Sequence, residues 1–231
     1  MKLSNNLVPI LSKTEFDAVA TNFLEKYYPE ALINPMAVPI EKIAVQVLNL
    51  QIKRVHLSED LSILGQIFFS PGRTEIYKKD TDEFVHKKVD SGMMFIDPDV
   101  AMMRNIGSEN NTIAHECVHW HIHRPYHNIQ TLAGGEKAVA CRCPIEPPSE
   151  HLESKWVAED WMEWHANGIA PRILMPKDIY SQYVKQHPSY QKICFGKGNT
   201  LLIDHLVSEL AEFFQVSRES ALIRLSELEL I

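Results

Sequence analysis

The stretch Ser108–Pro125 decides the fold, and it reads Ser-Glu-Asn-Asn-Thr-Ile-Ala-His-Glu-Cys-Val-His-Trp-His-Ile-His-Arg-Pro. A serine at its start and a proline at its end are typical helix boundaries. Ile113 and Ile122 supply apolar positions on either side of its centre. The stretch therefore predicts one helix, and its centre, His115–His119, matches the pattern His-Glu-x-x-His.

The motif has a chemical reason to lie on a helix. Positions 115 and 119 are four residues apart, so their side chains fall within about 40° of one another and one turn apart. Two imidazoles placed in this way can bind one Zn²⁺ at about 2.0–2.1 Å. Glu116 is rotated by about 100° from His115. It can therefore act as a general base on a water at the metal. The alternative is an ordinary helix with two exposed histidines and a surface glutamate.

A catalytic zinc also needs a third protein ligand and an open fourth position. A second helix, expected from residue 155 to residue 171, offers Glu159, Asp160, Glu163 and His165. We choose Glu163, because Asn167 lies one turn further on the same face. From there its amide can hydrogen-bond a ligating imidazole and fix its tautomer. Glu159 and His165 remain alternatives, and Glu163 can also be read as a solvated surface charge.

Together these pieces resemble the ImmA/IrrE-type zinc metallopeptidases, a family with a gluzincin-like core. Its first motif, H-E-x-x-H-x-x-x-H, is matched by His115, Glu116, His119 and His123. Its second, similar to E-x-x-A-N-x-F-A-A-x-L-L-M-P, is matched by residues 163–176, and it puts the third ligand at Glu163. A C-terminal pattern is matched by Val216-Ser217, Ala221 and Arg224-Leu225. The resemblance covers most of the chain.

The chain departs from the family pattern in three places. Residues 110–113 are Asn-Asn-Thr-Ile, where the family usually has a basic residue and a Phe-Thr pair. Pro171 replaces a small residue and should kink the second helix or end its regular part. His119 and Glu163 stand 44 positions apart, more than the family leads us to expect. These departures leave the ligands in place and bear on the fit of a substrate.

Composition excludes several classes of protein. The 231 residues include 23 basic and 30 acidic side chains, for a formal net charge of −7. An acidic chain of this kind is a poor candidate for direct nucleic-acid binding. The uncharged stretch Leu61–Gly72 is well below the roughly 20 apolar residues of a membrane span. We find no signal peptide, so we expect a cytoplasmic protein whose four cysteines are thiols.

The pattern of elements predicts an α+β fold. We expect a small, mostly antiparallel sheet packed on zincin-like helices, with a C-terminal helical cap, all within a single domain over residues 1–231. Its expected parts are N-terminal helices and sheet (about 1–107), zinc-binding helices with a long insertion (108–176) and the cap (177–231). Helices are expected at 14–28 and 40–48, and strands at 51–57, 64–70, 74–79 and 92–96. We expect Met93–Ile96 to be an edge strand that holds an extended peptide.

Several residues stay open to more than one interpretation. Cys141 and Cys143, with His127 and His151, can form a second zinc or redox site or pack beneath an irregular loop. Cys117 should face the core, His121 should face solvent, and His123 should lie at a helix end near the cleft. The candidates for stabilising an oxyanion are Tyr126, His127, Tyr180 and His205. The C-terminal helices can form a helix-turn-helix, but they carry few basic side chains, so we favour packing or partner docking.

The leading prediction is a zinc-dependent endopeptidase, with zinc held by His115, His119 and Glu163. The resemblance implies a regulatory protein substrate, such as a DNA-binding helix-turn-helix repressor of a mobile element or stress regulon. The alternative is a non-proteolytic regulatory or binding module with a structural zinc or no metal. A fourth protein ligand would favour that alternative, and an open water position would favour the peptidase.

Overall fold

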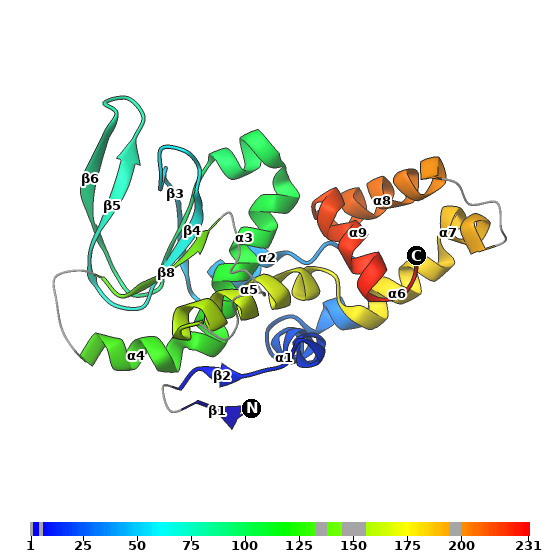
Figure 1. Ribbon diagram of the computed structural model, residues 1–231, viewed down its shortest axis with the longest axis horizontal. Helices are drawn as coiled ribbons and strands as arrows, with labels where there is room; N and C mark the ends of the chain where they lie inside the picture. Colours follow the sequence, from blue (N-terminus) through cyan, green and yellow to red (C-terminus); the bar gives the residue numbers. More distant parts are fainter. Residues whose placement is uncertain (1, 5–6, 133–137, 145–155, 195–199) are drawn as a thin grey trace.

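The structure of the chain is a computed structural model, which describes residues 2–4, 7–132, 138–144, 156–194 and 200–231 (Figure 1). The first elements are the short paired strands β1 (Lys2–Leu3) and β2 (Pro9–Ile10), followed by helix α1 (Phe16–Tyr27). The short helix α2 (Ile40–Lys42) continues into a π-helical turn, Ile43–Val47. These helices confirm the two predicted from the N-terminal sequence.

A mixed four-stranded sheet follows, in the order β3-β7-β4-β8. Its strands are β3 (Gln51–Arg54), β7 (Met93–Ile96), β4 (Ile63–Phe68) and β8 (Ala140–Pro144). Strand β3 runs parallel to β7, whereas β4 is antiparallel to both β7 and β8. The hairpin of β5 (Gly72–Lys78) and β6 (Glu83–Val89) forms a separate two-stranded ribbon. The α+β class predicted from the sequence is confirmed.

The prediction that Met93–Ile96 is an edge strand was wrong. Strand β7 pairs with β3 on one side and with β4 on the other, so both of its edges are already occupied. All four of its residues are buried: Met94 and Ile96 join the main core, while Met93 and Phe95 pack beneath the β5–β6 hairpin. A continuous apolar run of this kind is typical of a central strand covered on both faces.

The central helix is longer than the sequence predicted. Helix α3 (Ile106–Val118) is capped at its N-terminus by Asn105, whose side chain accepts a hydrogen bond from the Ser108 amide at 2.9 Å. It passes through a π-helical turn, His119–His123, into helix α4 (Arg124–Leu132). The predicted stop at Pro125 was therefore wrong. Pro125 lies in the first turn of α4, where a residue without an N–H is tolerated.

The remaining helices form the second half of the molecule. Helix α5 (Ala158–Leu174) contains Pro171 and runs on past it, so Pro171 does not end the regular part of the helix. The C-terminal elements are α6 (Lys177–Gln186), α7 (Pro188–Lys192), α8 (Thr200–Phe214) and α9 (Arg218–Glu227). In Figure 1 they gather at the end of the molecule opposite the β5–β6 hairpin. No helix in the described part of the chain is long and apolar enough to cross a membrane.

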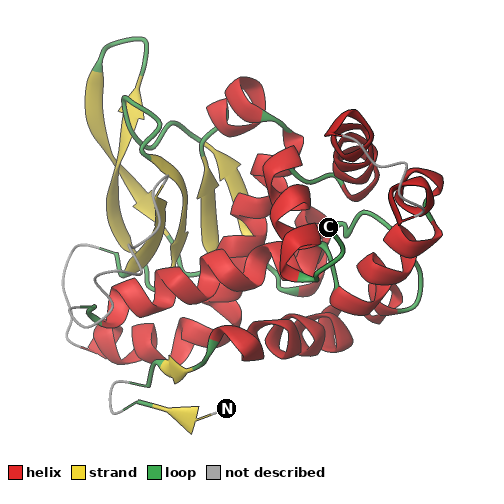
Figure 2. Cartoon of the chain, turned by 45° about the vertical axis from the view of Figure 1, so that its right-hand side comes forward, coloured by secondary structure: helices red, strands yellow, loops and turns green. Residues whose placement is uncertain are grey.

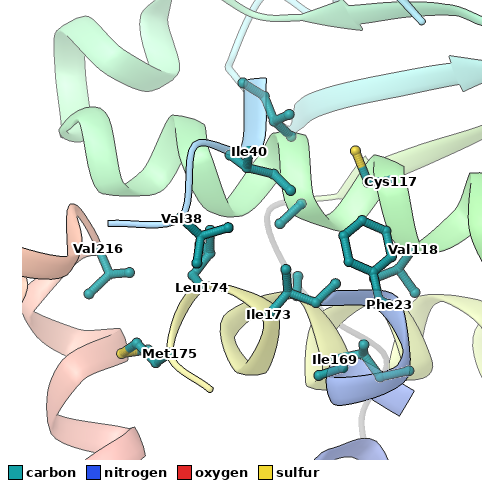
Figure 3. Packing of buried hydrophobic residues seen from close by; sticks show 14 of the residues in the cluster. Phe23, Val38, Ile40, Cys117, Val118, Ile169, Ile173, Leu174, Met175 and Val216 are labelled. Carbon is teal, nitrogen blue, oxygen red and sulfur yellow. The ribbon is translucent and has the colours of Figure 1, made fainter. Parts of the chain in front are cut away.

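The helices lie on one side of the sheet, and the β5–β6 hairpin covers the other (Figure 2). The main core joins α1, α3 and α5 to the C-terminal helices, through residues such as Phe23, Val118, Ile169 and Val216 (Figure 3). Cys117 is fully buried in this cluster, as predicted. Arg224 of α9 is also buried, and it donates to the Asp17 carboxylate of α1. This basic side chain therefore anchors the C-terminal helices to the core.

Candidate metal centre

The structure brings together the three residues that the sequence proposed as ligands. His115 and His119 come from α3 and its π-helical turn, and Glu163 comes from the neighbouring helix α5. The His119 Nε2 atom is 2.9 Å from His115 Nε2 and 3.3 Å from Glu163 Oε1, and His115 Nε2 is 3.1 Å from Glu163 Oε2. Ligand atoms around a tetrahedral zinc with bonds of about 2.0–2.1 Å are roughly 3.3–3.4 Å apart. The donor set and its spacing therefore fit zinc.

The charges of these residues also suit a cation. Burial acts to raise the pKa of Glu163, but the adjacent His119 and His115 lower it to about 2. Burial lowers the pKa of His119, although the Glu163 charge opposes it. The carboxylate is thus ionised and the imidazole neutral near pH 7, which are the forms that bind a metal. Only the Glu163 side chain has any exposure, at 13%.

Glu116 lies beside the three ligands, against strand β4. A Cβ added at Gly65 of that strand would lie 2.8 Å from Glu116 Oε1 and 2.7 Å from Thr112 Cγ2, so only glycine allows this close approach. Burial raises the pKa of Glu116 well above its usual range, and the Glu163 charge acts in the same direction. No side chain of the described residues hydrogen-bonds either Glu116 oxygen, and the backbone N–H groups of Cys143 and Ile67 offset only part of this rise in pKa. Such a carboxylate is a stronger base than an exposed one.

A row of buried histidines extends from His119, away from Glu163. His123 Nδ1 is 2.9 Å from His119 Nδ1, and His123 Nε2 is 3.4 Å from His165 Nδ1. The prediction that His123 lies at a helix end was wrong, because the helix continues into α4. It contacts the outer nitrogen of His119, which is the role of a residue that orients a metal ligand.

The other candidates from the sequence lie elsewhere. Glu159 accepts a hydrogen bond from the Tyr126 hydroxyl at 2.6 Å, and His165 contacts His123, so neither joins the three converging ligands. Asn167 makes no hydrogen bond to either ligating imidazole: its Nδ2 and His115 Nδ1 are both buried without a partner in the described chain. The hydrogen bond that we predicted from Asn167 to a ligating imidazole is not made, and His119 has His123 as its neighbour instead.

Two of the four candidates for oxyanion stabilisation lie in the C-terminal helices. Tyr180 is buried there and donates to the Ala221 carbonyl oxygen at 3.1 Å, and His205 is exposed and pairs with Glu209. Tyr126 and His127 lie on α4, which continues directly from the π-helical turn that carries His119. Burial, and after it the neighbouring His119, lowers the pKa of His127 to about 3. His127 is therefore a neutral imidazole near pH 7 and lies near His119.

The two cysteines of β8 do not share one site. Cys141 Sγ is 3.0 Å from His127 Nε2, whereas Cys143 faces His115 and Glu116. The fourth member of the proposed second site, His151, lies outside the described residues. Sequence reasoning treated this region as irregular and missed α4 and β8, although the alternation of Cys141, Arg142 and Cys143 was a signal for a strand.

The prediction that His121 faces solvent was wrong. Its side chain is half-buried between the rings of Phe23 and Tyr27, and its Nδ1 is 3.1 Å from the Tyr27 hydroxyl. The packing of α1 beside the π-helical turn covers this face, which sequence periodicity alone cannot show.

A comparison with protein families supports the peptidase interpretation. Residues 144–226 match the family model of peptidase family M78, described as the IrrE N-terminal-like domain. The match covers α5 with Glu163 and the helices that follow, and it confirms the resemblance to the ImmA/IrrE-type family. It supports a function of the metallopeptidase type. The motif His115–His119 lies outside the matched residues. Searches of curated proteins and of solved structures found no match.

Proposed function

We propose that this protein is a zinc-dependent endopeptidase in which His115, His119 and Glu163 hold the metal. The observation that carries the proposal is the convergence of these three side chains from two helices, with ligand atoms 2.9–3.3 Å apart. Two histidines and a glutamate are a donor set of catalytic zinc sites, which keep one position open.

Zinc, when bound, supplies a Lewis acid that polarises the scissile carbonyl and acidifies the attacking water. Glu116 accepts the proton of that water and delivers it to the nitrogen of the leaving amine. Its burial against Gly65 keeps the carboxylate basic. Among the four candidates, we assign to His127, which lies near His119, the hydrogen bond to the developing oxyanion.

The finer parts of the proposal concern the substrate. The family resemblance supports a protein substrate with a regulatory role, such as a DNA-binding helix-turn-helix repressor. A cytoplasmic location belongs to the same proposal, because all four cysteines are unpaired thiols and thiols persist in a reducing compartment.

Elemental analysis of the purified protein tests the metal site. We expect about one zinc per chain, lost in Glu163→Ala and kept in the control His165→Ala, because only Glu163 reaches the cluster. Glu116→Gln should keep its zinc and lose cleavage of an unfolded protein and of a candidate repressor. A wild-type protein that binds no metal when zinc is supplied would overturn the proposal.

A second candidate function is a non-proteolytic module with a structural zinc. One observation favours it: a thiol, that of Cys143, lies next to His115 and Glu116. Four protein ligands close a zinc site.

A further inference from the structure

A cavity of about 630 Å³ lies on the hairpin side of the sheet, away from the helices that carry the proposed metal ligands. In strand β4, Ile67 packs into the main core with the helices, whereas Phe68 packs beneath the β5–β6 hairpin. Successive side chains of a strand point to opposite faces, so Gln66 lies on the hairpin face with Phe68. Gln66 lines the cavity together with the loop 57–63 and residues of the hairpin. The cavity is therefore separate from the proposed metal site.

The side chain of Gln66 is the feature of this cavity that points to a ligand. It is 4% exposed, and its amide makes no hydrogen bond to any described residue. A buried amide without a partner destabilises a fold, so such groups are rare unless a water or a ligand pairs with them. An amide offers both donors and an acceptor. It therefore suits a ligand that accepts and donates at neighbouring atoms, as a peptide group does.

Arg142 lies beside Gln66 on the neighbouring strand. The two residues stand directly opposite each other in the antiparallel pairing of β4 with β8, which sets their Cβ atoms about 4.5–5.5 Å apart. Because the next residue, Cys143, lies with His115 and Glu116 on the helix face, Arg142 points to the hairpin face. Arg142 lines the cavity, is exposed and forms no ion pair within the described chain. Its guanidinium can thus donate to a carbonyl oxygen of a ligand.

Three carboxylates line the same cavity: those of Glu59 and Asp60 in the loop and that of Glu75 in β5. None of them forms an ion pair with a described residue, although the Arg142 guanidinium shares the cavity. A concave surface with an excess of one sign of charge concentrates ions of the other sign. Phe84 of β6 adds an exposed apolar surface, against which the stem of a lysine can pack. The lining therefore favours a cationic side chain.

We propose that this cavity binds a lysine- or arginine-bearing segment of a protein partner. The Gln66 amide pairs with a peptide group of the segment, Arg142 donates to a carbonyl oxygen, and the cationic side chain lies among the three carboxylates. As a site for substrate, this inference rests on the proposed function: the cavity holds a basic segment of the protein that the peptidase cleaves. Proteins that bind DNA carry lysine and arginine against phosphate. A repressor of the kind proposed as substrate therefore has segments of this composition.

Isothermal titration calorimetry at low salt tests the site on the full-length protein. The probe is the capped peptide acetyl-Ala-Lys-Ala-amide, and acetyl-Ala-Glu-Ala-amide is its matched control. We expect the lysine peptide to bind several-fold more tightly than the control. Its binding should weaken as salt is added, because the three carboxylates are exposed to solvent. Equal affinity for the two peptides, or binding of neither, would overturn the proposal.

Butylammonium separates recognition of a peptide from attraction of any cation. It is the lysine side chain without peptide groups, so it cannot use the Gln66 amide as a peptide does. We expect it to bind about five-fold more weakly than the lysine peptide. Butylammonium that binds as tightly would refute the part of the proposal that assigns a peptide to this cavity.

Two variants locate the binding site. Leucine removes only an amide that has no partner, so Gln66→Leu should keep its stability in urea unfolding and bind the lysine peptide about five-fold more weakly. Glu75→Gln changes an exposed side chain and should weaken binding several-fold. Glu83→Gln is its matched control, because Glu83 lies on the same hairpin but does not line the cavity. If neither Gln66→Leu nor Glu75→Gln alters binding, the peptide binds elsewhere and the proposal fails.

Cleavage of an unfolded protein distinguishes this proposal from the proposed function. A zinc-loaded wild type that prefers the lysine peptide but cleaves nothing keeps the binding site and refutes the peptidase. A wild type that cleaves but shows no preference for the lysine peptide keeps the peptidase and refutes the binding site. If it does both, the two proposals stand, and Glu75→Gln should then raise the KM for a lysine-rich protein substrate several-fold.

Discussion

Replacing His123 by leucine should weaken metal binding, although His123 is not one of the proposed ligands. The outer nitrogen of His119 contacts His123 Nδ1 at 2.9 Å, in a region where both rings are fully buried. Leucine leaves that nitrogen without a partner, at a cost of about 1–3 kcal/mol. Because the cost falls on the tautomer of His119 that binds the metal, we expect a zinc affinity about 10–100-fold lower.

Competition between the protein and a chromophoric chelator measures this affinity. His121→Leu is the matched control, because His121 lies on the same π-helical turn and contacts Tyr27 instead of a ligand. His123→Gln, whose amide can accept a hydrogen bond, should recover part of the loss. If His123→Leu folds and binds zinc as tightly as the wild type, the argument that His123 orients His119 is refuted.

Three further predictions follow from single contacts. Gly65→Ala should keep its zinc but lose cleavage and about 1–3 kcal/mol of stability, because the new methyl group meets Glu116 and Thr112. Adding Thr112→Ser to this variant should recover part of the stability, measured by urea unfolding. No recovery would argue against the steric explanation. The metal-free protein should lose stability as the pH falls below about 6.5. Burial lowers the pKa of His165 to about 4, so the unfolded state binds the proton first, and this residue alone costs about 2 kcal/mol of stability by pH 5. Urea unfolding that gives the same stability from pH 7 to pH 5 would contradict this. Arg224→Ala should cost about 3 kcal/mol, because it removes a buried cation that pairs with the half-buried Asp17 and donates to the Met175 carbonyl. Arg218→Ala, at an exposed pair with Asp204, should cost less than about 1 kcal/mol. Similar losses of stability in both variants would show that burial does not set the cost.

The position of the second ligand helix illustrates what could be predicted. His115 and His119 lie on one face of a helix because they are four residues apart, and Glu163 and Asn167 share a face of a second helix for the same reason. The choice of Glu163 over Glu159 and His165 rested on one neighbour, Asn167, and on the family resemblance. The structure brings Glu163 to the histidines, but Asn167, the neighbour that guided the choice, makes no contact with them.

Local sequence determined the elements of this protein. The repeat of apolar residues predicted α1, α3 and α5. Alternation predicted β3, an apolar run predicted β4, and the motif on α3 predicted a metal-binding face. These are properties of residues within one or two turns of each other, where backbone geometry alone sets which side chains are neighbours.

Only the tertiary structure decided how the elements meet. It placed β7 in the centre of the sheet, paired His123 with His119 and His165, and laid β8 along β4 so that Cys143 faces the proposed metal site. Each of these contacts joins residues through packing that no single element contains. Strand order and the close approach at Gly65 depend on the burial of whole faces against each other, and that is settled only when the chain is folded.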